Sequence, residues 1–161
     1  MKITNKSVNK LIPYTNNTRT HSDEQVQQIA SSIKEFGFTN WRFCNYNENY
    51  VVTECGNVLS ICRVQYNKNG TLRKDYKTRI LSGSIDKYGY RTVRMMVNGK
   101  KKHIKVHRIV ATAFLNNHEY KSQVNHKSMN KLDNSISNLE WCTDLENKKH
   151  FNLKVGNRWN S

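Results

Sequence analysis

The first regular pattern of apolar and polar positions falls between Asp23 and Phe36. Apolar side chains recur there at steps of three and four residues, at Val26, Ile29, Ala30, Ile33 and Phe36. This spacing places them on one face of a helix. Ser22 and Gln25 form a capping-box pattern before it, and Gly37 favours a left-handed stop after it. The pattern predicts an amphipathic helix over Asp23–Phe36.

After residue 40 the pattern changes to short β-like runs separated by glycines. The runs cover 50–52, 58–61, 79–81 and 90–97. Asn98-Gly99 joins the last run to Lys100–Val106 and predicts a hairpin, because that dipeptide tolerates the positive φ angles of a two-residue turn. Alternation along both strands allows one face to be buried while the other presents cations. A short helix over His107–Leu115 is expected next.

Between Val124 and His150 the pattern predicts strand, loop, strand and helix. The strands are 124–126 and 138–142, and a polar loop over 127–137 joins them. Thr143 and Glu146 form a second capping box, which opens the helix. Strand, loop, strand and helix together gather a set of polar side chains, namely Asn125, His126, Asn138, Asn147 and His150.

The residue types in this set suit hydrolysis of a phosphodiester with one metal ion. An imidazole can accept a proton from water at neutral pH. Amide oxygens can hold Mg²⁺ and leave coordination positions open for phosphate and water. A third polar group can fix the tautomer of the imidazole.

The net charge indicates a class of binding partner. The chain of 161 residues fits about one domain, and its net charge of +15 favours a polyanion. Residues 63–108 hold fourteen Lys and Arg and two Asp, a net charge of +12. A solvated basic face is the simple interpretation, but this concentration favours contacts with DNA phosphates. The candidate DNA-binding residues are Arg91, Arg94, Lys100, Lys101, Lys102, Lys105 and Arg108.

The same composition argues against membrane and disulfide-rich classes. The longest apolar stretch, Ile109–Leu115, is far shorter than the roughly 20 residues of a spanning helix. The first residues lack the apolar region of a signal peptide, so a cytoplasmic location is expected. The four cysteines form no C-x-x-C pair and are expected to be free thiols.

Several blocks of sequence, in order, resemble the HNH homing endonucleases of phages and introns. The blocks are Asn125-His126, Asn138-Leu139-Glu140-Trp141, Glu146-Asn147 and His150, preceded by His107–Phe114. Further upstream, Tyr50–Ser60 resembles a NUMOD-type module that accompanies such nucleases. The resemblance covers roughly residues 41–155.

This resemblance implies a ββα-metal site with specific roles. His126 would activate water, Asn138 would orient His126, and Asn125 and Asn147 would bind Mg²⁺ or Mn²⁺. Asn125 stands where many members have Asp or His, and a neutral amide is the weaker ligand. His150 is expected to be a further metal ligand, a phosphate contact or a cation at the helix end. The products would be 5′-phosphate and 3′-hydroxyl ends in double-stranded DNA, with a bacterial or phage-infected cell as the setting.

The N-terminal part resembles a different family. Leu11–Tyr14, Asn17–Ser22 and the helix through Phe38 are similar to the opening of ParB-like domains. We therefore expect an α+β chain with a ParB-like fragment over 1–40, a basic β-rich NUMOD-type DNA-binding module over 41–106 and an HNH nuclease domain over 107–161.

The expected function is a metal-dependent DNA endonuclease that nicks, acting as a monomer or homodimer. Two alternatives stay open. One is a DNA-binding protein that keeps the HNH scaffold without catalysis. The other is a basic RNA-binding accessory protein, which the lack of an aromatic RNP-like strand disfavours.

Overall fold

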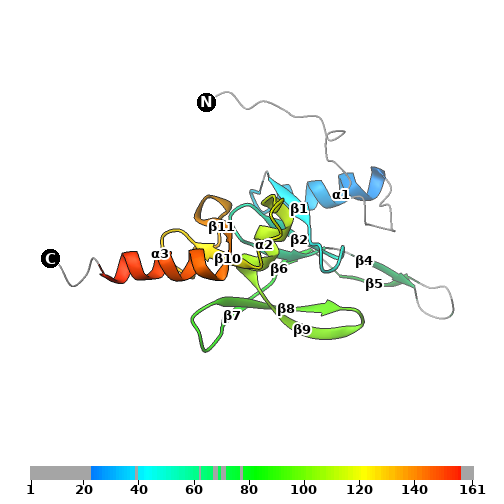
Figure 1. Cartoon of the computed structure of the whole chain (residues 1–161). Helices are drawn as coiled ribbons and strands as arrows, with labels where there is room; N and C mark the ends of the chain where they lie inside the picture. Colours follow the sequence, from blue (N-terminus) through cyan, green and yellow to red (C-terminus); the bar gives the residue numbers. More distant parts are fainter. Residues whose placement is uncertain are drawn as a thin grey trace, which may run out of the picture.

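The computed structural model is a mixed α and β structure, which confirms the expected fold class (Figure 1). It describes residues 23–38, 40–61, 63–66, 69, 72–76 and 78–156. The described helices are α1 (Asp23–Lys34), α2 (Val106–Phe114), α3 (Asp144–Gly156) and the short 3₁₀ helix η2 (Ile136–Asn138). In this part of the chain no helix is long and apolar enough to cross a membrane.

Helix α1 forms where the apolar stripe predicted it and ends two residues earlier, at Lys34. Gly37 then takes a φ of 78°, as expected for a left-handed stop. Ile29 and Ile33 pack with Val51, Leu59 and Ile61 of the neighbouring sheet. The earlier part of the ParB-like resemblance, up to and including Ser22, lies outside the described residues.

The sheet under α1 is antiparallel and has the strand order β1-β2-β3-β6. Its strands are β1 (Trp41–Phe43), β2 (Tyr50–Thr53), β3 (Val58–Ser60) and β6 (Arg79–Ile80). Three of these match predicted runs. Strand β1 was not predicted, because its three residues are too few to show an alternation.

A second sheet, with the order β7-β8-β9, carries the predicted hairpin. Its strands are β7 (Gly83–Ile85), β8 (Arg91–Val97) and β9 (Lys100–Lys105). Asn98 and Gly99 have φ angles of 51° and 73°, which confirms the turn. In the chain between β3 and β6, β4 (Arg63–Tyr66) and β5 (Leu72–Tyr76) form a further hairpin, which the polar sequence there did not reveal.

The third unit is the expected strand, loop, strand and helix, called here the ββα unit. Strand β10 (Gln123–His126) pairs antiparallel with β11 (Leu139–Cys142), and α3 follows. The capping box at the start of α3 is confirmed. The Thr143 backbone N–H donates to Oε2 of Glu146 at 2.7 Å, and the Glu146 N–H donates to Oγ1 of Thr143 at 3.2 Å.

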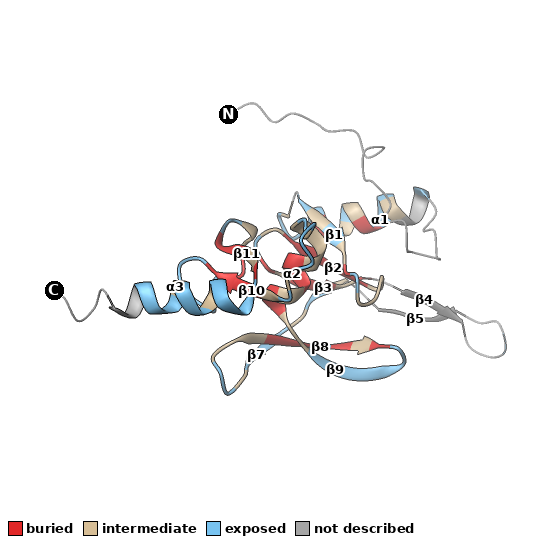
Figure 2. Ribbon diagram, in the orientation of Figure 1, coloured by how far each residue is buried: buried red, intermediate tan, exposed pale blue. Residues whose placement is uncertain are grey.

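Helix α2 lies at the centre and joins the sheets to the ββα unit (Figure 2). Its buried residues include Val106, Ile109 and Val110, which share one core cluster with Val93 of β8 and Leu139 of β11. Apolar burial is the main stabilising term of such a cluster. One core thus contains side chains that precede residue 106 in the sequence and side chains that follow it. The ββα unit is therefore fixed to the β7-β8-β9 sheet. By contrast, Figure 2 shows that most of α3 is exposed.

Cys44, Cys55 and Cys142 are free thiols, as expected, and Cys62 lies outside the described residues. Burial raises the pKa of Cys44, so this thiol stays protonated in the core.

Candidate nuclease site

His126 lies at the end of β10 and is 4% exposed. Its Nε2 lies 3.3 Å from Oδ1 of Asn134, a residue of the loop between β10 and β11 that is itself buried. The orientation of the Asn134 amide is fixed by its Nδ2 atom, which donates to the backbone oxygen of Leu132 at 2.9 Å. The oxygen of Asn134 therefore faces the imidazole as an acceptor.

This contact sets the tautomer of His126. Because Oδ1 of Asn134 can only accept, Nε2 of His126 carries the proton and donates it. Nδ1 is then the ring nitrogen with a lone pair, as a base that activates water requires. Burial lowers the pKa of His126, while the bond to Asn134 and the charge of Asp133 act in the opposite direction. A lowered pKa keeps the imidazole neutral, and so able to accept a proton, at neutral pH.

Asn138 ties the loop between the strands together. Its Oδ1 accepts from the Ser128 N–H at 2.8 Å, its Nδ2 donates to the Asp133 oxygen at 2.8 Å, and its backbone oxygen accepts from the Lys127 N–H at 2.8 Å. The side chain thus bonds to the loop rather than to the ring of His126. Any orienting effect of Asn138 on His126 acts through the loop that also carries Asn134.

Asn125 and Asn147 both lie at the junction of β10 with α3. Nδ2 of Asn125 donates to Oε1 of Glu140 at 2.7 Å and lies 3.2 Å from Nδ1 of His150. Nδ2 of Asn147 donates to Oε1 of Gln123 at 2.7 Å. These bonds place Asn125 beside His150 and Asn147 beside Gln123. His126 and Asn138 were expected in the same group, but their hydrogen bonds go to Asn134 and to the loop between the strands.

The donor set suits a hard divalent cation. Within the described residues, Oδ1 of Asn125 and Oδ1 of Asn147 accept no hydrogen bond, so both oxygens remain able to bind a ligand. The same part of the chain holds no group of three or more His, Cys, Asp and Glu side chains arranged as a metal site. Proteins usually hold Mg²⁺ through one or two carboxylates together with water and phosphate, so two neutral amide oxygens would make a weaker site that leaves most positions to water and phosphate.

His107, in the first turn of α2, lies beside His126. The two rings lie 5.0 Å apart in an edge-to-face arrangement, and the Tyr90 ring lies 4.9 Å from His107. Burial, with the charges of His126 and Lys105 adding, lowers the pKa of His107 to about 3. His107 is thus a neutral ring in the native protein, and it packs against the ring of His126.

Two contacts fix the ββα unit to the upstream sheets close to His126. Nζ of Lys131 donates to the Tyr88 oxygen at 3.0 Å and lies 4.7 Å from the centre of the Tyr90 ring. On another side, the backbone of Gly56 approaches Asn134 so closely that a Cβ on Gly56 would lie 2.8 Å from the Asn134 Cβ. The loop that holds His126 is therefore supported from both neighbouring sheets.

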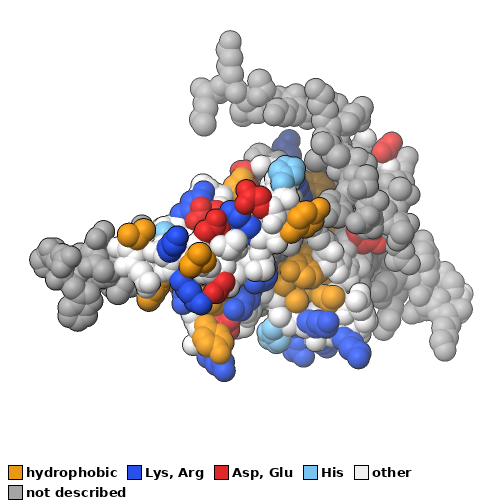
Figure 3. Space-filling model, viewed as in Figure 1, with side chains coloured by type: hydrophobic (Ala, Val, Ile, Leu, Met, Phe, Trp, Pro, Cys, Tyr) orange, Lys and Arg blue, Asp and Glu red, His pale blue; other side chains and the backbone are white. Residues whose placement is uncertain are grey.

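The candidate DNA-binding residues fall into two groups. Arg94, Lys100, Lys101 and Lys102 are exposed on the β8–β9 hairpin, where Figure 3 shows Lys and Arg side chains gathered on the surface. The other three candidates make internal bonds. Arg91 donates to the Gly56 oxygen at 3.4 Å, Arg108 donates to the Ser122 oxygen at 3.3 Å, and Lys105 lies 3.8 Å from Asp86.

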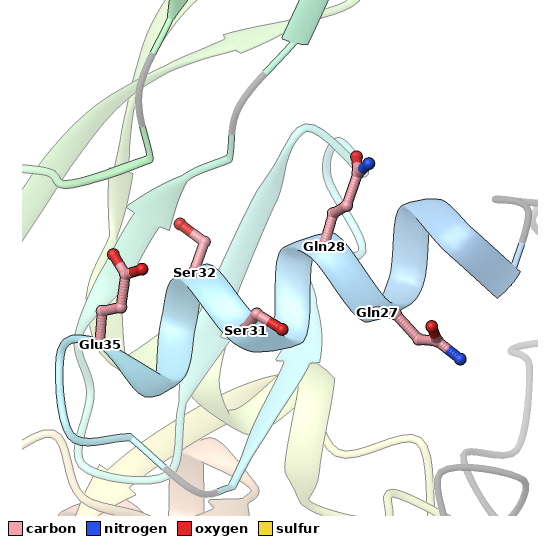
Figure 4. A pocket seen from close by; sticks show the side chains of 5 residues that line it. All are labelled: Gln27, Gln28, Ser31, Ser32 and Glu35. Carbon is pink, nitrogen blue, oxygen red and sulfur yellow. The ribbon is translucent and has the colours of Figure 1, made fainter.

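Two hollows mark the surface away from His126. One, of about 390 Å³, lies beside the hairpin and is lined by Arg79, Arg94 and Lys101 among others. The other, of about 460 Å³, lies along α1, and the described residues that line it come from that helix (Figure 4). The first adds Arg79 to the cationic surface. The described lining of the second is Gln, Ser and one Glu.

Four residues of the site were not singled out as functional from the sequence, namely Gln123, Asn134, Glu140 and Tyr90. Asn134 sits in a polar loop among other Asn and Ser residues, so nothing in the local pattern distinguished it. Glu140 was a detectable candidate, because Asn125 and Glu140 are direct partners in the antiparallel register once both strands are predicted.

Comparison with known proteins places this site in a family. Residues 105–149 match the family described as HNH endonuclease. The DNA endonuclease I-HmuI of Bacillus phage SP01 is 34% identical over 102 residues, which are 63% of this chain and 51% of that protein. An uncharacterised HNH endonuclease of Acanthamoeba polyphaga mimivirus is 36% identical over 104 residues, which are 65% of this chain and 27% of that protein.

A third relative is of a different kind. An Escherichia coli protein named for a ParB-like nuclease domain is 52% identical over 40 residues, which are 25% of this chain and 46% of that protein. The chain thus spans between 27% and 51% of the length of these three relatives.

The fold comparison agrees with the sequence comparison. A solved structure described as "DNA binding and cleavage by the HNH homing endonuclease I-HmuI" matches with a TM-score of 0.57 and 31% identity. The match covers 73% of this chain and 60% of that one. The expected resemblance to HNH homing endonucleases is therefore confirmed in sequence and in fold. The segment that carries His126 on β10, Asn138 in η2 and Asn147 on α3 matches the HNH endonuclease family.

Proposed function

We propose that this protein is a metal-dependent DNA endonuclease that hydrolyses phosphodiester bonds in double-stranded DNA and cuts one strand. The proposal is carried by two features of the ββα unit: the His126 imidazole, whose tautomer Asn134 fixes, and the Oδ1 atoms of Asn125 and Asn147, which accept no hydrogen bond from the described residues. I-HmuI, a DNA endonuclease, shares this fold.

The proton transfer falls to His126. Its Nδ1 accepts a proton from water, whose oxygen forms a bond to phosphorus while the bond from phosphorus to the 3′ oxygen breaks. A proton from solvent completes the departing 3′-hydroxyl, and the phosphate stays on the 5′ side. Proton transfer to His126 needs the neutral ring, which the lowered pKa of His126 supplies at neutral pH.

Asn125 and Asn147 are the residues that would hold the metal through their Oδ1 atoms. A bound Mg²⁺ or Mn²⁺ stabilises negative charge on the phosphate and the departing oxygen. HNH nucleases generally use divalent ions, which agrees with this donor set. His150 binds Asn125 in this arrangement and is a contact to the amide rather than a required ligand.

DNA binding is assigned to the exposed cations of the β8–β9 hairpin, Arg94 and Lys100–Lys102. Phosphate contacts supply most of the affinity of such basic surfaces. One copy of His126 per chain supports nicking, because a second cut would need a second site or a second binding event. A dimer would place two such sites on one duplex.

A plasmid assay tests this function. The purified full chain is incubated with supercoiled plasmid in Mg²⁺, in Mn²⁺ and in EDTA, and relaxed and linear products are separated on a gel. Relaxed circles are expected with either ion, and no product with EDTA or with His126→Ala. The exposed His118→Ala serves as the matched control and should cleave normally.

The plasmid assay, together with DNA-binding experiments, separates the alternatives. A DNA-binding protein without catalysis would retard plasmid DNA with any ion and leave it uncut, whether or not His126 is intact. An RNA-binding protein would release labelled duplex DNA when an equal concentration of RNA is added. Cleavage by His126→Ala at the wild-type rate would overturn the assignment of the base.

A further inference from the structure

We propose that Glu140 and Gln123 are positioning residues that hold the Asn125 and Asn147 amides with their oxygens turned toward the metal ion. The inference rests on the proposed metal-dependent function and adds to it two residues that act without touching the ion. Its basis is a pair of hydrogen-bond chains that each end on a carboxylate, one at Glu140 and one at Asp144.

The first chain crosses the β10–β11 pair. Asn125 and Glu140 are direct partners in the antiparallel register, and Nδ2 of Asn125 lies 2.7 Å from Oε1 of Glu140. An ionised carboxylate only accepts hydrogen bonds, so the amide must turn its NH₂ group toward it. The second N–H of that group points to Nδ1 of His150 at 3.2 Å, which acts as acceptor. Both donors of Asn125 are then used, and Oδ1 is left for the ion.

The second chain joins β10 to α3. Nε2 of Gln123 donates to Oδ1 of Asp144 at 2.9 Å, which fixes the direction of the Gln123 amide. Oε1 of Gln123 must then face Asn147, and it accepts from Nδ2 of Asn147 at 2.7 Å. Asp144 thus orients Asn147 indirectly, through Gln123. In both candidate ligands Nδ2 is held by a neighbouring side chain, and Oδ1 accepts no hydrogen bond from the described residues.

The first chain also explains why an amide can stand at position 125. A carboxylate there would have an oxygen close to the carboxylate of Glu140, where the Asn125 nitrogen now lies at 2.7 Å. Like charges at that distance repel. The residue types at 125 and 140 are therefore coupled: an amide with a carboxylate, or a carboxylate with an amide. In this chain the negative charge lies on Glu140, which accepts a hydrogen bond from the proposed ligand Asn125, instead of on the ligand itself.

Mn²⁺ binding to the full chain, followed by electron paramagnetic resonance as loss of the free-ion signal, tests the proposal without cleavage. Glu140→Ala should weaken Mn²⁺ binding about tenfold, the usual effect of removing a group that orients a metal ligand. Glu140→Gln keeps an acceptor oxygen and should bind Mn²⁺ more tightly than Glu140→Ala. Gln123→Ala should also weaken binding, whereas Lys148→Ala, which removes only the other partner of Asp144, should not.

The decisive comparison is a double variant. Asn125→Asp alone should bind Mn²⁺ weakly, because two carboxylates then face each other. Asn125→Asp combined with Glu140→Gln should bind at least tenfold more tightly than Asn125→Asp alone and cleave plasmid. Equal Mn²⁺ affinity of Asn125→Asp with and without Glu140→Gln would overturn the coupling. Circular dichroism of each variant confirms that it is folded, and the double variant keeps the test valid if Glu140→Ala does not fold.

The outcomes also separate this inference from the function on which it rests. If Asn125→Ala leaves Mn²⁺ binding unchanged, the metal site itself is wrong and the proposed function fails. If Asn125→Ala abolishes Mn²⁺ binding while Glu140→Ala and Gln123→Ala both bind like the wild type, only the positioning role fails.

Discussion

Asn134 contacts Nε2 of the His126 imidazole at 3.3 Å, and so decides which ring nitrogen carries the proton. The Asn134 amide is itself fixed by its bond to the Leu132 oxygen, and Asn134 is 2% exposed. The loop between β10 and β11 thus does more than connect two strands, because it carries the group that orients the His126 ring.

Replacement of Asn134 should damage catalysis more than DNA binding. Asn134→Ala removes the acceptor for Nε2 of His126, so the ring loses its fixed tautomer and kcat should fall about tenfold or more. The KM for duplex DNA should stay near the wild-type value. Asn134→Asp keeps an acceptor and should recover most of kcat. The exposed Asn130→Ala in the same loop is the control, and equal kcat for it and Asn134→Ala would contradict this role.

Gly56 should prove essential because of the close approach to Asn134. Gly56 and Gly37 both have positive φ angles, of 81° and 78°, so an alanine at either should cost about 1 to 2 kcal/mol in the free energy of unfolding. Only Gly56→Ala adds a clash, since Gly37 has no atom within 4 Å of a built Cβ. Urea unfolding should show a larger loss for Gly56→Ala, and plasmid nicking should fall with it. Equal losses for both variants would show that the approach to Asn134 is unimportant.

Much of the fold was predictable where local signals are strong. The stripe of α1, the Asn98-Gly99 turn and the capping box of Thr143 and Glu146 each depend on residues close together in the chain, and all three elements formed. Strands β1, β4, β5 and β7 were missed. Each is short, and its stability comes from pairing with a strand that the local sequence does not show.

The residues of the candidate site also fall into those that the sequence predicted and those that it did not. The residues that the motif spacing indicated, His126, Asn125 and Asn147, lie where a strand and a helix were predicted. The groups that orient them come from register and loop geometry. Asn134 reaches His126 through a folded loop, and His107 reaches it from α2 through the shared core. Such contacts depend on tertiary packing, which a spacing rule cannot supply.

The exposed hairpin cations should set the salt dependence of DNA binding. Arg94→Ala and Lys101→Ala each remove one candidate phosphate contact, so each should lower the slope of log Kd against log salt concentration by about 1. The metal requirement for nicking should not change. Fluorescence anisotropy with a labelled duplex in EDTA measures the slope. Lys34→Ala, at the end of α1, is the control and should keep the wild-type slope. An unchanged slope for both hairpin variants would remove the hairpin from the DNA interface.

Buried His107 should make the protein lose stability in mild acid. Its pKa is about 3 in the native protein and 6.5 for an ordinary histidine, so between these values only the unfolded chain binds the proton. The stability that the neutral ring permits is therefore complete above pH 6.5 and falls as the pH drops toward 3. At pH 5 the loss from this one group is about 2 kcal/mol relative to pH 8.

His107→Phe keeps a ring against Tyr90 and His126 but cannot be protonated. Its free energy of unfolding, measured with urea at pH 8 and at pH 5, should differ between the two pH values by about 2 kcal/mol less than in the wild type. Burial also lowers the pKa of His126, so the variant should keep part of the acid loss. The exposed His118→Phe should keep all of it. If His107→Phe and the wild type lost equal stability at pH 5, the native ring of His107 would have to be open to protonation, against its burial in the core.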